Sequence, residues 1–478
     1  MDEILSSGHA EPVPTECPPD GKIWYLPHFA VYHPKKKKLR VAFDASVKYQ
    51  DKCLNDELLS GPDHVNCLPG ILLRFRKEPI AFSGDIQKMF LNFKVNTEER
   101  DYLRFLWVDR DLETIKEYRM TVHLFGATSS GVATFALRKL ASEASEKHPA
   151  AANFIIKDFY VDDGIRSVKS PEEAINLIRD TTNICKAANL RLHKFISNSR
   201  EVLEAIPESE KTANLQGLHL YKDTLPSERT LGLGWCTEKD AFIFTSNPID
   251  KPATKRGILS SVSQIYDLLG FLAPFLLQGR IVMQQACQES KGWDNEVSPT
   301  LQSKWKQWRD NLNNLNQIHI PRCLKPTEFG DVKRAEIHYF SDASFDGYGA
   351  CAYSRIINNE GNIHVTLIAA KSKVVPLKGL TIPRLELQSS VEATRLKSFI
   401  GEELDMDIDQ ECFWSDSKAA LGFIKNNDTP FQFFTANRVS EIRRHSNPKQ
   451  WHHVPGSENP ADSVTWSFSK STYEKHMV

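Results

Sequence analysis

Three aspartates stand where they could hold metal ions. Asp162 and Asp163 are adjacent and precede a glycine between two apolar runs, while Asp85 ends another apolar run that begins at residue 80. A D-G step between apolar runs indicates a hairpin, which puts the adjacent pair at its tip. Like charges held together favour a bound cation, and three such carboxylates can bind two magnesium ions for phosphoryl transfer. The alternative reading of this short box is a polar turn.

A second set of four carboxylates lies in the last third of the chain. These are, in order, Asp342, Glu386, Asp416 and Asp462. Asp342 and Asp416 follow strand-like apolar runs, whereas Glu386 and Asp462 fall on helical patterns. A single acid is usually solvated or caps a helix, so each one alone means little. Together they could hold two metal ions and activate water against a phosphodiester.

The elements that must position the first set indicate a sheet covered by helices. Strands are predicted at 39–43, 80–85 and 153–160, a hairpin at 161–168, and helices at 66–75 and 132–144. A further helix is predicted to begin after Ser170, because an N-cap residue, a first-turn proline and two acids follow one another there. This order suits a sheet with helices on one face.

A separate α/β unit is predicted to position the second set. Its strands are expected at 337–340, 349–353 and 365–370, with helices from about 383 and 417. The intervening region reads as connecting structure, with short strands at 231–235 and 241–244 and a long apolar helix over 259–288.

Four segments, taken in order, resemble the BEL/Pao family of retrotransposons. They are LRVAFDAS (39–46), LLRFRKEPIAFSGDIQKMF (72–90), HLFGATSSGVATFALRKLA (123–141) and FYVDDGIRSV (159–168). The resemblance covers roughly residues 1–466 and implies an RNA-directed DNA polymerase with ribonuclease H activity. It implies an α+β and α/β multidomain fold: a right-hand polymerase of fingers, palm and thumb, a connecting region, and a ribonuclease H-like α/β domain. The expected divisions are 1–190 for fingers and palm, 191–330 for thumb and connection, 331–466 for ribonuclease H, and 467–478 for a divergent tail.

The resemblance also implies roles for individual residues. Asp85, Asp162 and Asp163 would bind Mg²⁺, or Mn²⁺, for polymerisation, and Asp342, Glu386, Asp416 and Asp462 would do so for RNA cleavage. Arg40 and Tyr160 would contact the incoming dNTP, and Phe90 would exclude a ribose 2′-hydroxyl, because an aromatic ring under the sugar leaves that group no room. The alternative interpretation is that Phe90 is an ordinary core side chain.

Basic residues supply candidate contacts to nucleic acid. Lys38, Arg74 and Arg76 lie in two basic clusters, and Lys194 lies in a segment resembling the one that holds the primer strand. The alternative is that these clusters are ordinary solvated faces. The expected partners are an RNA template, a DNA primer, an RNA–DNA hybrid, dNTPs and other segments of a retroelement polyprotein.

A beginning that reads as truncated and two departures from the family pattern support a second hypothesis, a catalytically impaired or domesticated remnant that only binds nucleic acid. Gly131 stands where proline is expected, and the chain diverges after Asp462. Separately, Ser457 and Glu458 occupy the region where related enzymes carry a mobile histidine that handles a proton at product release. Residues 254–270 resemble a region often labelled a Pao retrotransposon peptidase. An aspartic peptidase needs D-T-G or D-S-G, and neither occurs in the sequence, so proteolysis is not predicted.

Composition narrows the class of protein. Hydrophobic residues make up 41% and charged residues 25%, which is typical of a folded, soluble chain, and the formal net charge is −1. The nine cysteines are scattered, with no C-x-x-C pair, which favours reduced thiols in an intracellular protein. No membrane role is predicted. The family suggests a cytoplasmic virus-like particle, with the nucleus as the alternative.

Overall fold

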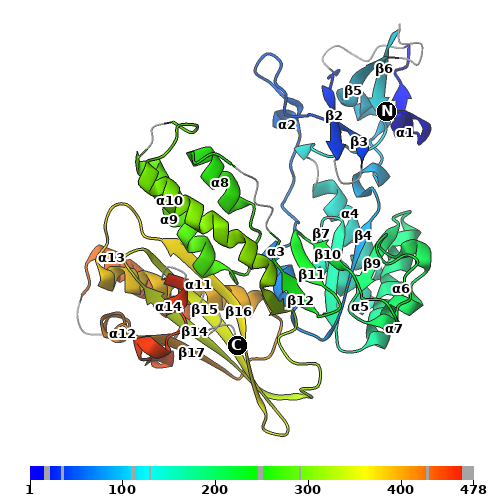
Figure 1. The fold of residues 1–478 in the computed structure, drawn as a ribbon. Coiled ribbons are helices and arrows are strands. Elements are labelled where there is room, and N and C mark those ends of the chain that lie inside the picture. Colours follow the sequence, from blue (N-terminus) through cyan, green and yellow to red (C-terminus); the bar gives the residue numbers. More distant parts are fainter. Residues whose placement is uncertain are drawn as a thin grey trace.

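The computed structural model describes residues 1–15, 22–33, 37–108, 114–128, 131–245, 251–289, 292–426 and 430–465. Across these residues the chain has a mixed α/β fold with five sheets. Figure 1 shows a small N-terminal lobe joined to a central unit, with a group of helices and a C-terminal unit beside it. Residues 129–130, the tail from 466 and the side chain of Lys38 lie outside the described part.

The N-terminal lobe combines a three-stranded sheet with a hairpin. The sheet has the order β1 (Ala10–Pro12), β6 (Ile115–Met120), β5 (Arg104–Val108), and the hairpin pairs β2 (His28–His33) with β3 (Lys38–Phe43). The short helices are α1 (Asp2–Ser6), α2 (Leu54–Glu57), η1 (Met89–Asn92) and η2 (Thr97–Leu103). Phe105 and Met120 are fully buried in the small core of this lobe.

The central unit is a four-stranded antiparallel sheet with helices on both faces. The strand order is β7 (Phe159–Tyr160), β8 (Asp163–Val168), β4 (Ile80–Ile86), β9 (Leu192–Ser197). The helices are α3 (Leu68–Arg74), α4 (Gly131–Ala144), α5 (Pro149–Asp158), α6 (Pro171–Ala187), α7 (Arg200–Ala205) and η4 (Glu208–Glu210). Neighbouring strand residues point to opposite faces, so Phe82 packs under the α4–α6 helices while Ala81 faces the core that includes α3.

Most predicted elements of the central unit are confirmed, and one is wrong. Ser170 caps α6 by accepting a hydrogen bond from the Glu173 amide, as its position predicted. Residues 153–160 were expected to be a strand, but helix α5 continues to Asp158 and only Phe159 and Tyr160 are extended. Pro149 starts the helix at its first turn, and the alanines that follow favour a helix over a strand.

The middle of the chain forms a second four-stranded sheet and a group of helices. The sheet, called here the middle sheet, has the order β10 (Ser227–Thr230), β11 (Leu233–Cys236), β12 (Ala241–Ile243), β13 (His319–Pro321). The helices are α8 (Lys255–Ser263), α9 (Ala273–Glu289), α10 (Pro299–Asp310) and η5 (Asn311–Gln317). The single long helix expected over 259–288 is broken between α8 and α9. Gly270 in the break has φ +79°, and a β-carbon there would overlap the Ala370 carbonyl.

The C-terminal unit is a five-stranded mixed sheet. Its order is β16 (Ile363–Val374), β15 (Gly347–Asn358), β14 (Val332–Ala343), β17 (Gln410–Ser415), β18 (Trp451–His453), with β17 parallel to both β14 and β18. The helices are α11 (Ile382–Glu403), α12 (Lys418–Lys425), α13 (Phe433–His445), η6 (Pro448–Gln450), η7 (Gly456–Glu458) and α14 (Asp462–Thr465). Strand β14 packs against α11. Asp342, near the carboxyl end of β14, lies beside the start of this helix.

One hydrophobic core joins the units. It runs from Ile71 and Phe75 beside the central sheet, through Trp235 in the middle sheet, to Leu387 and Trp451 in the C-terminal unit. The domain divisions predicted from the sequence therefore cross a shared core and stay predictions. In the described residues, the cysteines have free thiols, and no helix is both long and apolar enough to cross a membrane.

Candidate metal centres

The first carboxylate cluster lies at one edge of the central sheet. Asp85 near the end of β4 is directly opposite Asp163 at the start of β8, and Asp162 occupies the preceding turn. The Ile86 amide donates a 2.8 Å hydrogen bond to the Asp162 carbonyl, which ties that turn to β4. Val161 has φ +58°, a strained value for a β-branched residue. The hairpin thus places the adjacent pair beside Asp85, as the sequence predicted.

Crowding of these acids raises their pKa values. Burial, followed by the charges of Asp162 and Asp85, raises the pKa of Asp163 to about 7. Burial also raises the pKa of Asp162. Such shifts mark a site whose charged form needs a cation for stability, and hard carboxylate oxygens are the ligands that Mg²⁺ prefers. The donor set therefore fits the metal.

Two residues next to Asp85 went unrecognised as partners in the sequence. His193 Nε2 lies 2.8 Å, and Lys194 Nζ 2.7 Å, from Asp85 Oδ1. Lys194 was expected to contact the primer strand, but the structure turns its half-exposed side chain to Asp85 and holds its backbone at φ +53°. The L-H-K segment was the available signal. Register across β4 and β9, which the sequence does not encode locally, makes these two residues neighbours of Asp85.

The second cluster is more compact. Asp342 ends β14, Glu386 lies in the second turn of α11, and Asp416 follows β17, so three elements converge. One oxygen from each of the three carboxylates lies within 4.8 Å of the others, a closeness that the first cluster does not reach among the described residues. Thr465 donates a hydrogen bond to Asp342 Oδ2 from the last helix. Asp462 stands outside the compact trio but near enough for its charge to raise the pKa of Asp342.

The second cluster is also strongly self-repelling. Burial first, then the charges of Asp342 and Asp416, raises the pKa of Glu386 to about 9. Burial, with Asp416 and Asp462 behind it, raises the pKa of Asp342 to about 6. Glu386 Oε2 and Asp416 Oδ1 are buried without a hydrogen-bond partner. Unsatisfied buried oxygens on three converging acids fit one or two divalent cations.

The residues expected to face a nucleotide lie on three different elements. Phe90 is half-buried in η1 and makes an edge-to-face contact with exposed Phe125, at 5.7 Å between ring centroids. Tyr160 is half-buried at the end of β7. Arg40 is exposed on β3, opposite Val31. Their roles toward dNTP stay predictions.

The structure corrects the predicted contacts of Arg74 and Arg76 with nucleic acid. Arg76 is fully buried, and its guanidinium donates only to backbone carbonyls. Arg74 is largely buried between the carboxylates of Asp158 and Glu403. Arg76 is therefore buried away from any phosphate, and the Arg74 guanidinium is engaged by protein acceptors.

Part of the chain is similar to a known protein family. Residues 254–417 match the family model described as Pao retrotransposon-like RNaseH-like domain, a range that runs from α8 through Asp342, Glu386 and Asp416. The matched family is described as RNaseH-like, whereas residues 254–270 were expected to belong to a region labelled a peptidase. No curated protein matches the chain.

Solved structures of a foamy virus protein share the fold. The foamy viral protease-reverse transcriptase dRH in complex with ds DNA has a TM-score of 0.60 at 14% identity, covering 95% of this chain and 68% of that chain. The same protein with an RNA/DNA hybrid gives 0.56 at 14%, covering 98% and 54%. With dsDNA it gives 0.57 at 14%, covering 95% and 80%. The family match therefore covers residues 254–417, and the likeness to the foamy virus structures shows a shared fold over most of the chain.

Proposed function

We propose that the chain is an RNA-directed DNA polymerase that also cleaves the RNA of the resulting hybrid. The observation that carries this proposal is the presence of two separate acidic clusters, each built from carboxylates that converge from different elements of one chain. The central unit would be the palm, the N-terminal lobe the fingers, and helices α8–α10 the thumb. The C-terminal unit would be the ribonuclease H domain.

In polymerisation, Asp85, Asp162 and Asp163 would hold Mg²⁺ at the hairpin tip. Bound there, the metal would activate the primer 3′-hydroxyl and stabilise the leaving pyrophosphate. Asp85 must turn from His193 and Lys194 toward the other two acids to share a metal with them. Lys194 then becomes free to meet negative charge that develops on the triphosphate. The Phe90 ring would exclude a ribose 2′-hydroxyl, while Arg40 and Tyr160 would contact the dNTP.

In RNA cleavage, Asp342, Glu386 and Asp416 would hold metal, with Asp462 at the rim. Glu386 comes from helix α11 and Asp416 from the end of β17, so three different elements would supply the metal ligands. Thr465 binds one oxygen of the Asp342 carboxylate, and the other oxygen would be available to the metal.

The proposed partners are an RNA template, a DNA primer, their hybrid and dNTPs. The similar foamy virus structures are described as complexes with dsDNA and with an RNA/DNA hybrid, which supports a duplex as the ligand. Recognition would follow backbone shape and the 2′-hydroxyl rather than sequence. Other polyprotein segments would be partners in a cytoplasmic particle, with the nucleus as the alternative site of action.

One observation favours the second candidate, an impaired remnant that only binds nucleic acid. Asp85 is paired with Lys194, and this leaves the first cluster less compact than the second. A remnant would keep this ion pair in the presence of metal.

The decisive experiment compares three chains for Mg²⁺-dependent dNTP incorporation on an RNA template and for cleavage of that RNA. The natural chain should do both. Asp162→Asn should abolish incorporation and keep cleavage, and Asp416→Asn should do the reverse. If the natural chain incorporates nothing while it binds the hybrid, the remnant reading holds instead.

A further inference from the structure

Arg76 connects the central unit to the C-terminal unit from a fully buried position. It follows α3, and its guanidinium donates to the carbonyls of Arg322 at 3.0 Å, Leu367 at 2.8 Å, Ile368 at 2.7 Å and Pro321 at 3.4 Å. Within the part of the chain that the structure describes, no carboxylate binds this guanidinium. The Phe271 ring lies under the cation, 4.9 Å from ring centroid to Cζ. A buried cation with no counterion is costly, so its retention depends on every one of these acceptors.

Strand β16 is irregular at the point where Arg76 meets it. Ala352 pairs with Ala369 and the next residue, Tyr353, pairs with Leu367, so Ile368 is an extra residue without a partner on β15. A bulge of this kind leaves backbone groups out of the ladder. At this irregularity Arg76 Nη1 donates to two adjacent carbonyls, those of Leu367 and Ile368. The bulge and the arginine are therefore complementary.

Arg322 connects the middle sheet to the central unit. It follows β13 of the middle sheet, is fully buried, and binds both Asp240 oxygens, at 2.6 Å and 2.7 Å. Its remaining donors reach the carbonyls of Phe75, Glu78 and Pro79, the segment that carries Arg76. Arg322 thus holds the backbone of the central unit, while Arg76 uses that backbone to hold β16.

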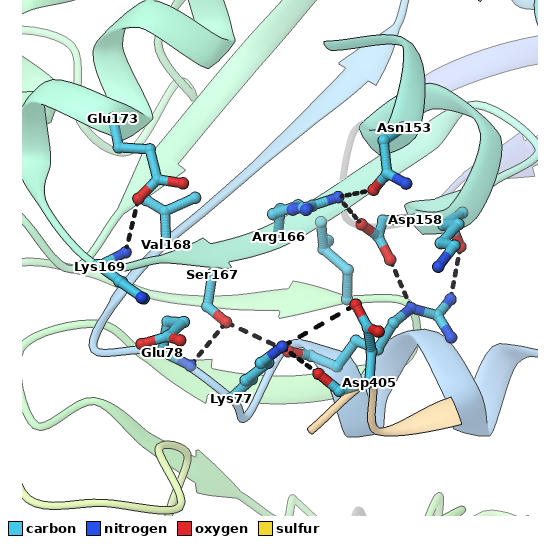
Figure 2. A pocket seen from close by; sticks show the side chains of 13 residues that line it. Lys77, Glu78, Asn153, Asp158, Arg166, Ser167, Val168, Lys169, Glu173 and Asp405 are labelled. Carbon is cyan, nitrogen blue, oxygen red and sulfur yellow. Dashed lines mark hydrogen bonds and ion pairs between the residues drawn. The ribbon is translucent and has the colours of Figure 1, made fainter. Parts of the chain in front are cut away.

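The rim of the same interface is polar, with a cavity of about 180 Å³ lined by charged side chains. Figure 2 shows Lys77 reaching Asp405 of the C-terminal unit, while Arg166 and Asp158 pair within the central unit. Partly exposed ion pairs of this kind contribute little and weaken with salt. The buried arginines at the centre and the largely buried Arg74–Glu403 ion pair therefore provide most of the polar attachment.

We propose that Arg76 and Arg322 form an interdomain clasp that fixes the C-terminal unit to the central unit, and that Arg76 is a positioning residue for RNA cleavage. Strand β16 pairs with β15, and β15 pairs with β14, which ends in Asp342. A clasp on β16 therefore sets where the second cluster stands relative to the first. One consequence rests on the proposed function: the RNA should be cut at one set distance from the growing primer end.

The test uses the full chain and a variant, Arg76→Met, which keeps the length of the side chain but has no donors. Calorimetry of the natural chain should give a single unfolding transition, because the two units share the clasp. The variant should give two transitions, with the C-terminal unit unfolding first. On a hybrid with one fixed primer end, the natural chain should cut at one position, and the variant should spread its cuts over about one helical turn, roughly 10 base pairs.

Arg443→Met is the matched control. Arg443 also donates to backbone carbonyls, of Ile424 and Asn426, but entirely inside the C-terminal unit. It should lower the unfolding temperature and leave one transition and one cut position. Should Arg76→Met fail to fold, Arg76→Lys replaces it, since lysine cannot serve all four carbonyls in their fixed geometry.

Two outcomes overturn the clasp: a single transition in the Arg76 variants with a midpoint like that of the natural chain, or an unchanged cut position. If the natural chain neither incorporates dNTP nor cuts RNA, the proposed function fails. Calorimetry, which needs no activity, then decides the clasp alone.

Discussion

Lys194 Nζ lies 2.7 Å from Asp85 Oδ1, so a lysine partly neutralises the acid that must otherwise share a metal. Removing the lysine leaves three carboxylates with His193 as their neighbour. Lys194→Met should lower the melting temperature of the metal-free protein by at most about 2 °C, because exposed ion pairs are weak. Saturating Mg²⁺ should erase that difference. A thermal shift assay with and without EDTA measures it, and a deficit that persists in Mg²⁺ would mean that Lys194 has a purely structural role.

The acidic clusters predict how stability changes with pH. The pKa of Glu386 is raised to about 9, that of Asp163 to about 7 and that of Asp342 to about 6, so the folded state keeps protons that the unfolded state has released. Where the folded state binds more protons, stability falls as the pH rises. The metal-free protein should therefore lose stability steadily from about pH 4 to about pH 9.

Melting temperatures in EDTA across that range measure this loss. Mg²⁺ should raise the melting temperature most at the alkaline end, because binding requires deprotonated ligands. Glu386→Gln should flatten the upper part of the EDTA profile. Metal-free protein that becomes more stable on going from pH 6 to pH 9 would contradict the assigned causes.

Glu386→Gln also separates the two activities. Loss of one ligand should remove several kcal/mol of transition-state stabilisation, so RNA cleavage should fall more than about a hundredfold. The dNTP incorporation rate should change less than about twofold, because additive behaviour is expected for distant sites. Asp346→Asn, a change at an exposed acid in the β14–β15 turn, is the matched control and should leave cleavage intact. Equal loss of both activities would argue for global damage.

Phe90→Ala tests selection of the sugar. Opening space beside Phe125 should allow ribonucleotides to enter, and discrimination against them should fall by about tenfold to a hundredfold. Single-nucleotide incorporation of each dNTP against its rNTP gives the ratio. Phe93→Ala, at a neighbouring half-buried ring, controls for packing alone. Similar losses in both variants would make Phe90 a core residue.

Gly270 should be intolerant of any side chain. Gly270→Ala adds a β-carbon at φ +79° against the Ala370 carbonyl, and should cost at least about 3 kcal/mol in unfolding free energy. Gly361→Ala is the matched control, with φ +85° and open space around the β-carbon, and should cost about 1 kcal/mol. Denaturant midpoints compare them. Equal costs would show that backbone strain, and not the contact with β16, limits this position.

Local patterns predicted that Asp85 lies near the Asp162–Asp163 pair and that Asp342, Glu386 and Asp416 converge, whereas Asp462 stands outside the compact trio. The D-G hairpin places Asp163 opposite Asp85, and short apolar runs mark the strands that carry Asp342 and Asp416. The strand predicted over 153–160 was wrong, since a short apolar run has no period that separates strand from helix. The contact of Arg76 with β16 could not be predicted from the sequence. Its acceptor on β16 is 291 residues away, and only tertiary packing brings the two together.

The bulge in β16 bears on how such chains can recombine. A hybrid gene that joined residues 1–330 to the C-terminal unit of a distant element would place a foreign edge strand over Arg76. Because β16 is the edge strand of its sheet, a regular strand there would turn alternate carbonyls toward Arg76 but not two adjacent ones, so the buried guanidinium would lose an acceptor. Exchange should therefore succeed best between elements in which the arginine and the bulge occur together.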